Sequence, residues 1–103
     1  MTIKKITHKE EINLDTKDLI VVDFYADWCG PCQMISREIK EIAKQYKDLT
    51  IYKVNIDEFP DLAMEYDVLS IPTLLFIKDN EIKDEVIGYK DKIFISDRID
   101  ENL

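Results

Sequence analysis

The sequence contains a nearly continuous apolar run from Leu19 to Ala26, rich in β-branched and aromatic residues, which restricts the possible folds more than any other segment. Such a run is typical of a strand covered on both faces, and these strands lie centrally in sheets sandwiched by helices. The run contains one acidic residue, Asp23, which its apolar neighbours predict to be buried. Directly after the run come the two cysteines of the chain, Cys29 and Cys32.

Beyond the cysteines, the continuous apolar run gives way to a helical pattern. After Pro31, apolar residues recur along one stripe, which predicts a helix of about four turns. The residues of this stripe are Ile35, Ile39, Ile42, Ala43 and Tyr46. The two cysteines therefore lie where a buried strand ends and a helix begins.

Shorter patterns predict the rest of the fold. Before the apolar run they indicate a strand at Ile3 to Thr7 with a helix in roughly the next dozen residues. After the long helix they indicate a strand at Leu49 to Ile56 and a short helix from Asp57 and Pro60 to about Tyr66. The last part of the chain is predicted to form an inner strand at Thr73 to Ile77, a turn at Asp79-Asn80, an antiparallel hairpin strand at Glu81 to Ile87, and a terminal amphipathic helix around Phe94, Ile95 and Ile99. We therefore expect an α/β fold, with a mixed sheet of four or five strands flanked by helices. A chain of 103 residues has room for one domain, residues 1–103.

Composition restricts the partners and the compartment. Acidic residues outnumber basic ones by 22 to 14, the formal charge is −8, and no basic cluster could follow a phosphate backbone. The first residues show no apolar signal core, and no apolar run approaches the roughly 20 residues that span a bilayer. We expect a cytoplasmic, monomeric protein that binds neither nucleic acid nor membrane.

The spacing of the cysteine pair favours redox chemistry. Residues three apart in a helix have Cα atoms about 5 Å apart, within the range of roughly 4.4–6.8 Å that a disulfide requires. Unpaired N–H groups at a helix N-terminus stabilise an anion and so favour thiolate over thiol. Because Cys29 precedes Cys32 and is nearer the loop, we expect Cys29 to be exposed and to act as the attacking nucleophile.

Two other uses of the pair are less well supported. A C-x-x-C pair can be half of a zinc site, but zinc needs four ligands, and the chain offers only His8 and scattered carboxylates besides. Two inert core cysteines are also disfavoured, because Gly30 and Pro31 between them force a turn at an accessible edge. We therefore expect no metal site.

The segment around the cysteines resembles the active site of the thioredoxin family. It reads Val22-Asp23-Phe24-Tyr25-Ala26-Asp27-Trp28-Cys29-Gly30-Pro31-Cys32, and its W-C-G-P-C core is far more specific than C-x-x-C alone. The resemblance continues downstream through Lys53-Val54-Asn55-Ile56-Asp57, then Ile71-Pro72-Thr73, and finally Gly88. In order and spacing these segments cover nearly the whole chain.

The resemblance implies roles for the matched residues. Asp23 resembles the buried carboxylate that helps remove the proton of the resolving cysteine, and Lys53 resembles the lysine near that carboxylate. Pro72 resembles the cis-proline that lies against the cysteines, and Trp28 resembles the aromatic residue that shields the disulfide. The catalytic residues would be Cys29, Cys32, Asp23 and Lys53. The substrate-binding residues would be Trp28, Gly30, Pro31, Ile71, Pro72, Thr73 and Gly88.

Four positions depart from the family pattern. Ser70 replaces the glycine often found before Ile-Pro, Tyr89 follows Gly88 where smaller residues are common, Asn80 holds a hairpin position often occupied by glycine, and Tyr25 replaces a second tryptophan. The catalytic assignment survives these changes. The substrate groove does not follow from the family, because Ile71, Ile87, Gly88 and Tyr89 should form its rim.

The mechanism that these residues favour is dithiol–disulfide exchange with oxidised proteins as substrates. The thiolate of Cys29 would attack a substrate disulfide, and Cys32 would resolve the mixed disulfide. The chain has no dinucleotide fingerprint, so the resemblance implies a separate thioredoxin reductase and no cofactor beyond the Cys29–Cys32 disulfide. Two alternatives remain: an oxidant or isomerase of the same architecture, and a binding module whose groove around Trp28 and Pro72 docks a partner without redox chemistry.

Overall fold

One mixed sheet of five strands organises the computed structural model, which describes residues 1–103. The strands are β1 (Thr2–Lys5), β2 (Ile20–Tyr25), β3 (Thr50–Asn55), β4 (Thr73–Lys78) and β5 (Glu81–Ile87). The helices are α1 (Gly30–Ile42), α2 (Pro60–Glu65) and α3 (Lys92–Asn102), with short 3₁₀ turns η1 (Lys9–Glu11) and η2 (Ala43–Gln45). The predicted α/β class with a mixed sheet is confirmed.

The strand with the most apolar sequence lies in the middle of the sheet, as predicted. The order is β1-β3-β2-β4-β5, so β2 pairs on both edges, parallel to β3 and antiparallel to β4. Every residue of β2 is buried, Asp23 included. The predicted hairpin of β4 and β5 is antiparallel, and its turn residues Asp79 and Asn80 both have positive φ.

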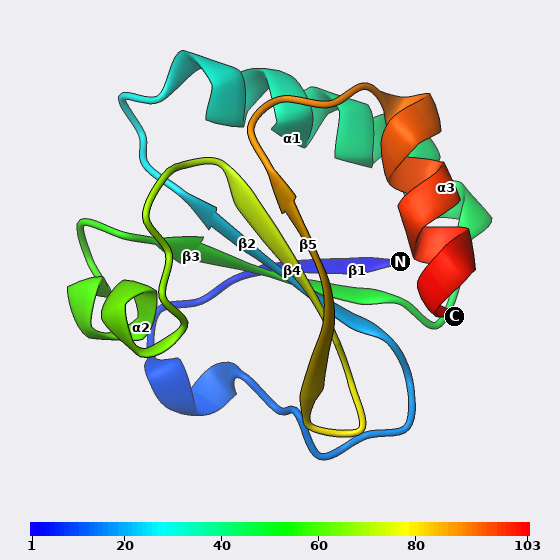
Figure 1. Ribbon diagram of the computed structural model, residues 1–103, viewed down its shortest axis with the longest axis horizontal. Helices are drawn as coiled ribbons and strands as arrows, with labels where there is room; N and C mark the ends of the chain where they lie inside the picture. Colours follow the sequence, from blue (N-terminus) through cyan, green and yellow to red (C-terminus); the bar gives the residue numbers. More distant parts are fainter.

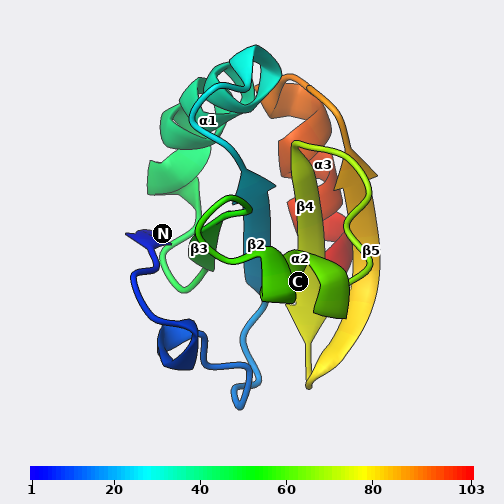
Figure 2. The ribbon, with the colours of Figure 1, turned by 90° about the vertical axis from the view of Figure 1, so that its left-hand side faces the viewer.

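Two apolar layers hold the helices against the sheet. Helices α1 and α3 lie next to each other in both views and cover one face (Figures 1 and 2). On that face Ile35 of α1 and Ile95 of α3 pack with strand residues such as Val21. The opposite face carries α2, where Leu62 packs with Val22. Fully burying an aliphatic side chain of this size contributes roughly 1.5–3 kcal/mol, so these layers determine on which face each helix lies.

The helix that follows the cysteines begins and ends for local reasons. Cys29 is its N-cap, and Pro31 occupies the first turn, where a missing N–H costs nothing because that group has no partner inside the helix. The helix spans 13 residues and ends at Ile42. Ala43, the next residue of the predicted stripe, begins η2, and Tyr46 follows that turn. The N-terminus of α1 follows shortly after the C-terminal end of β2.

The predicted helix near the N-terminus is wrong. Only η1 forms there, and short polar side chains bind the backbone beyond it: Asn13 Oδ1 accepts from the N–H of Asp15, and Thr16 Oγ1 accepts from that of Asp18. Such local bonds offer the backbone an alternative to the helix. No helix in the structure is both long and apolar enough to cross a membrane.

Candidate active site

The two cysteines form a disulfide at the first turn of α1. Their Cα atoms are 5.2 Å apart, in agreement with the distance of about 5 Å predicted from helix geometry. The backbone N–H of Cys32 points at the Sγ atom of Cys29, 3.2 Å away. A helix N-terminus of this kind favours negative charge, so the sulfur of Cys29 lies where a thiolate is stabilised.

The expectation that Cys29 is exposed is wrong for this oxidised form. Cys29 is 5% exposed and Cys32 is 4% exposed. The pair packs with Tyr25 and Ala26 at the end of β2, and Ile71 also lies against this cluster. Position in the chain alone could not reveal this covering, because Ile71 reaches the cysteines from a distant loop.

Trp28 lies beside the disulfide with most of its side chain in solvent. It is 71% exposed, and its indole Nε1 donates a hydrogen bond to Asp57 Oδ2 at 2.9 Å. Together with Ile71 and the exposed Leu69 it borders a mainly apolar hollow between the cysteine loop and the α2–β4 loop. The hydrogen bond with Asp57 fixes the indole ring on one side of this hollow.

The segment around Pro72 is linked to Gly88. The Ile71–Pro72 peptide bond is cis, as predicted. Thr73 Oγ1 donates to the carbonyl oxygen of Ser70 at 2.6 Å, and the N–H of Gly88 donates to that of Pro72 at 2.8 Å. Gly88 has φ of 83°, a conformation that L side chains rarely adopt. The structure thus brings the matched segments at Ile71 to Thr73 and at Gly88 together.

The end of β5 and the loop that follows it present apolar surface. Ile87 is 51% exposed, and Tyr89 is partly exposed. The hydroxyl of Tyr89 donates to Glu38 Oε1 on α1 at 2.7 Å, which ties the ring across to that helix. This hydrogen bond holds the ring of Tyr89, one of the four positions at which the sequence departs from the family pattern.

Asp23 is the buried carboxyl of the site. It is 1% exposed, and its Oδ1 atom has no hydrogen-bond partner. Burial raises the pKa of Asp23 from 3.8 to about 7, since an apolar surrounding disfavours the charged form, and the nearby Lys53 ammonium opposes this rise. The carboxyl can therefore gain or lose a proton near neutral pH.

Lys53 lies next to Asp23 in the sheet but binds elsewhere. The two residues are register partners between β2 and β3, yet they form no ion pair. Instead Lys53 Nζ donates to Ser36 Oγ at 3.1 Å and lies 4.6 Å from the centre of the Tyr25 ring. Sequence reasoning did not identify Ser36. Its spacing of four residues from Cys32, which places both on one helix face, is the signal that could have found it.

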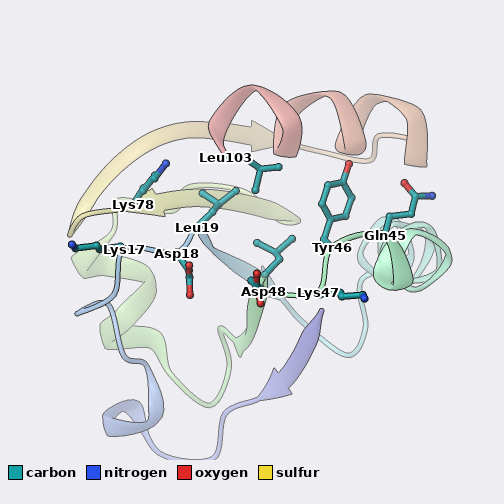
Figure 3. Close-up of a pocket in the computed structure, with 10 residues that line it drawn as sticks. Lys17, Asp18, Leu19, Gln45, Tyr46, Lys47, Asp48, Lys78 and Leu103 are labelled. Atoms are coloured by element: carbon teal, nitrogen blue, oxygen red, sulfur yellow. The ribbon is translucent and has the colours of Figure 1, made fainter.

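Two hollows of similar size lie at opposite ends of β2. One, of about 310 Å³, reaches Cys32 and is lined by Tyr25, Ala26, Asp27, Cys32, Gln33, Ser36, Arg37, Lys40 and Lys53. The other, of about 320 Å³, is bordered by Leu19, Tyr46, Leu103 and charged residues of both signs such as Lys17 and Asp18 (Figure 3). That second hollow contains no cysteine, and the predicted site residues lie at the other end of the strand. No group of three or more metal-ligating side chains is present.

The chain is similar to known thioredoxins over nearly its whole length. A family model described as Thioredoxin matches residues 1–101. The chain is 38% identical over 104 residues to a thioredoxin of Staphylococcus epidermidis, covering all of both chains. It is 42% identical over 98 residues to Thioredoxin 1 of Synechococcus elongatus, covering 94% of this chain and 91% of the relative.

Another relative is longer than this chain. The M-type chloroplastic thioredoxin of Spinacia oleracea is 42% identical over 95 residues, which is 91% of this chain but 52% of the relative. The chain thus spans about half the length of that plant protein.

Solved structures of thioredoxins have the same fold. A mutant thioredoxin from Halobacterium salinarum NRC-1 superposes with a TM-score of 0.87 at 35% identity, covering 98% of this chain and 90% of that chain. The oxidised mitochondrial thioredoxin 3 of Saccharomyces cerevisiae gives a TM-score of 0.85 at 33% identity, covering 96% and 94%. These matches, with the disulfide at the start of α1, show that the chain belongs to the thioredoxin family of thiol–disulfide oxidoreductases and that Cys29 and Cys32 are its redox-active pair.

Proposed function

We propose that this protein reduces disulfides in other proteins by dithiol–disulfide exchange, with Cys29 as nucleophile and Cys32 as resolving thiol. The observation that carries the proposal is the Cys29–Cys32 pair, closed as a disulfide at the N-terminus of α1. Asp23, in the strand that leads to this pair, is buried. A disulfide that can form there without moving the backbone can also open there, as a reversible electron carrier must.

The first step belongs to Cys29. Its thiolate attacks one sulfur of the substrate disulfide, and the other substrate sulfur leaves as a thiolate that takes up a proton. The N–H of Cys32 and the dipole of α1 stabilise the attacking anion, which supports Cys29 rather than Cys32 as the attacker. The product is a mixed disulfide between Cys29 and the substrate.

The second step belongs to Cys32, with Asp23 as proton acceptor. Asp23 takes the proton of the Cys32 thiol, and the resulting thiolate attacks Cys29 Sγ. The second substrate thiolate is released, and the Cys29–Cys32 disulfide closes. Two electrons have then passed to the substrate. A carboxyl whose pKa is about 7 is matched to this proton transfer at neutral pH.

The surface around the pair would receive the substrate and a reductase. We assign substrate contacts to Trp28, Gly30, Pro31, Ile71, Pro72, Thr73 and Gly88. Exposed apolar side chains at Trp28, Leu69 and Ile87 support a protein as the substrate, since an apolar surface fits a polypeptide better than a small polar thiol. Regeneration requires a separate thioredoxin reductase.

Residues 1–103 form one thioredoxin-like domain that acts as a monomer in the cytoplasm and takes part in electron transport and redox homeostasis. It uses no cofactor other than its own disulfide. Its partners do not include nucleic acid, which the formal charge of −8 disfavours, or membranes.

Reduction of insulin disulfides and the mass of trapped adducts test the assignment. Cys29→Ser should abolish insulin reduction and form no adduct, because the attacking thiol is gone. Cys32→Ser should attack once and accumulate a mixed disulfide, visible by intact-mass analysis. Ser96→Ala, a substitution on α3 away from the site, is the matched control. An adduct on Cys29→Ser and none on Cys32→Ser would reverse the two roles, and an inactive wild type would favour a binding module.

A further inference from the structure

The contact between Lys53 and Ser36 is not explained by the proposed exchange steps. Asp23 and Lys53 are register partners in parallel strands, so their side chains leave the sheet on the same face. An unpartnered carboxylate oxygen and an ammonium group on neighbouring strands would be expected to pair. Lys53 Nζ nevertheless donates to Ser36 Oγ on α1 at 3.1 Å, and no ion pair joins it to Asp23.

We propose that Ser36 is a positioning residue that holds the Lys53 ammonium away from the Asp23 carboxylate and so keeps that carboxylate a competent acceptor for the Cys32 proton. The proposal rests on the proposed function of Asp23. It assigns to the hydroxyl of Ser36 a role in the resolving step, although Ser36 itself touches neither substrate nor the reacting sulfur atoms.

Two contacts hold Lys53 in its observed position. One is the hydrogen bond to Ser36 Oγ, and the other is the face of the Tyr25 ring, whose centre lies 4.6 Å from Nζ. A cation over an aromatic ring is attracted by the electron-rich face but is not held at one point by it. The hydroxyl of Ser36 is the only hydrogen-bond acceptor that Lys53 Nζ has within the chain, so it determines the direction of the ammonium group.

Few other charged groups face Asp23. On β3, Lys53 is the one charge that acts on it, and on β4 its register partner is the apolar Leu74. On α1, the side facing the site presents Cys32 and Ser36, and the cations Arg37 and Lys40 line the solvent hollow beside them. Since no other charge competes, the position of the Lys53 ammonium controls the electrostatics of this carboxyl.

Loss of the Ser36 hydroxyl should therefore move Lys53 toward Asp23. In Ser36→Ala the Lys53 ammonium loses its hydrogen-bond acceptor. The unpartnered Oδ1 atom of Asp23, its register partner, is then the acceptor that remains available. An opposite charge within about 4–6 Å lowers a carboxyl pKa by roughly 1–3 units. A carboxylate stabilised in this way holds the Cys32 proton less well, so it becomes a weaker base for the resolving step.

The direct test is a ¹³C NMR titration of the Asp23 side-chain carboxyl in the oxidised protein. Ser36→Ala should lower the pKa of Asp23 by about one unit or more. Ser36→Thr keeps the hydroxyl and should titrate like wild type, and Ser96→Ala controls for loss of a helix serine elsewhere. In a Lys53→Met background, removal of the Ser36 hydroxyl should have no further effect, because its target is gone.

A kinetic test measures the same contact in the reaction. The pH profile of Cys32-dependent release from a preformed mixed disulfide should shift to lower pH in Ser36→Ala, with a lower plateau rate, while the rate of Cys29 attack stays the same. An unchanged Asp23 titration in Ser36→Ala, or one that Ser36→Thr fails to restore, would overturn the positioning role. A shifted Asp23 titration with an unchanged pH profile of Cys32-dependent release would support the role of Ser36 in positioning Lys53. It would overturn the role of Asp23 as proton acceptor in the proposed function.

Discussion

Replacing Asp23 by alanine should stabilise the protein at neutral and alkaline pH, because a buried carboxylate is expensive to ionise. Burial raises the pKa of Asp23 to about 7 from its ordinary value of 3.8, so the folded state binds this proton more tightly than the unfolded state. Asp23 therefore costs no stability in acid. The cost begins above the unfolded pKa and is complete once the pH has risen through the folded pKa.

The size of this cost follows from the two pKa values. At about 1.4 kcal/mol per pKa unit, the rise from 3.8 to about 7 corresponds to about 4 kcal/mol above pH 7. Between pH 5 and pH 9 the wild type should lose about 3 kcal/mol of this, since part of the cost is already present at pH 5. The cavity left by alanine lowers the stability of the variant by an amount that does not depend on pH.

The assay is urea unfolding of the oxidised wild type and Asp23→Ala at intervals from pH 5 to pH 9. The quantity to compare is the difference in unfolding free energy between the two proteins, which should change by about 3 kcal/mol in favour of the variant as pH rises. Reading the change with pH rather than the absolute difference removes the cavity contribution. A difference that stays constant across this range would refute the argument, because it would show that Asp23 ionises in the folded protein as it does in the unfolded chain.

Three further substitutions test the packing and the ends of the fold by urea unfolding. Ile35→Ala, at a side chain with no exposure, should cost about 2–5 kcal/mol, and a loss below 1 kcal/mol would contradict its place in the core. Asp91→Ala removes the N-cap bond to the N–H of Phe94 at 2.9 Å and should cost about 1 kcal/mol; an unchanged stability would show that this cap contributes nothing. Leu69→Ser, at a side chain that is 97% exposed, should change stability by less than about 0.5 kcal/mol, and a larger loss would reveal packing that the structure does not contain.

Local patterns predicted the elements that bury a complete face. The run from Leu19 to Ala26 contains β2, and the stripe that includes Ile35 and Ile39 lies in α1 with both residues buried. These predictions succeed because a strand covered on two faces and a helix covered on one each leave a periodic trace in the chain. No such periodic pattern follows η1. There, hydrogen bonds between short polar side chains and the backbone, such as the one that Asn13 Oδ1 accepts from the N–H of Asp15, form in place of the predicted helix.

The cysteine pair could also be predicted from local spacing, whereas its burial could not. Cys29 and Cys32 are three residues apart, and helix geometry alone brings their Cα atoms within disulfide range. Part of their covering comes from Ile71, which belongs to a loop far along the chain. Spacing in sequence says nothing of such an approach, so the predicted exposure of Cys29 was wrong.

Most of the helices and strands, the central place of the Leu19 to Ala26 strand and the position of the cysteines at a helix N-terminus could be predicted from the sequence. Each of these features depends on residues within a few turns of one another. Which groups meet across elements depends on the tertiary structure. The register of β2 with β3 places Lys53 beside Asp23, and the packing of α1 on the sheet brings Ser36 to Lys53. The physical reason is that strand order and helix placement depend on how all the buried faces pack together. No local segment of the sequence contains that information.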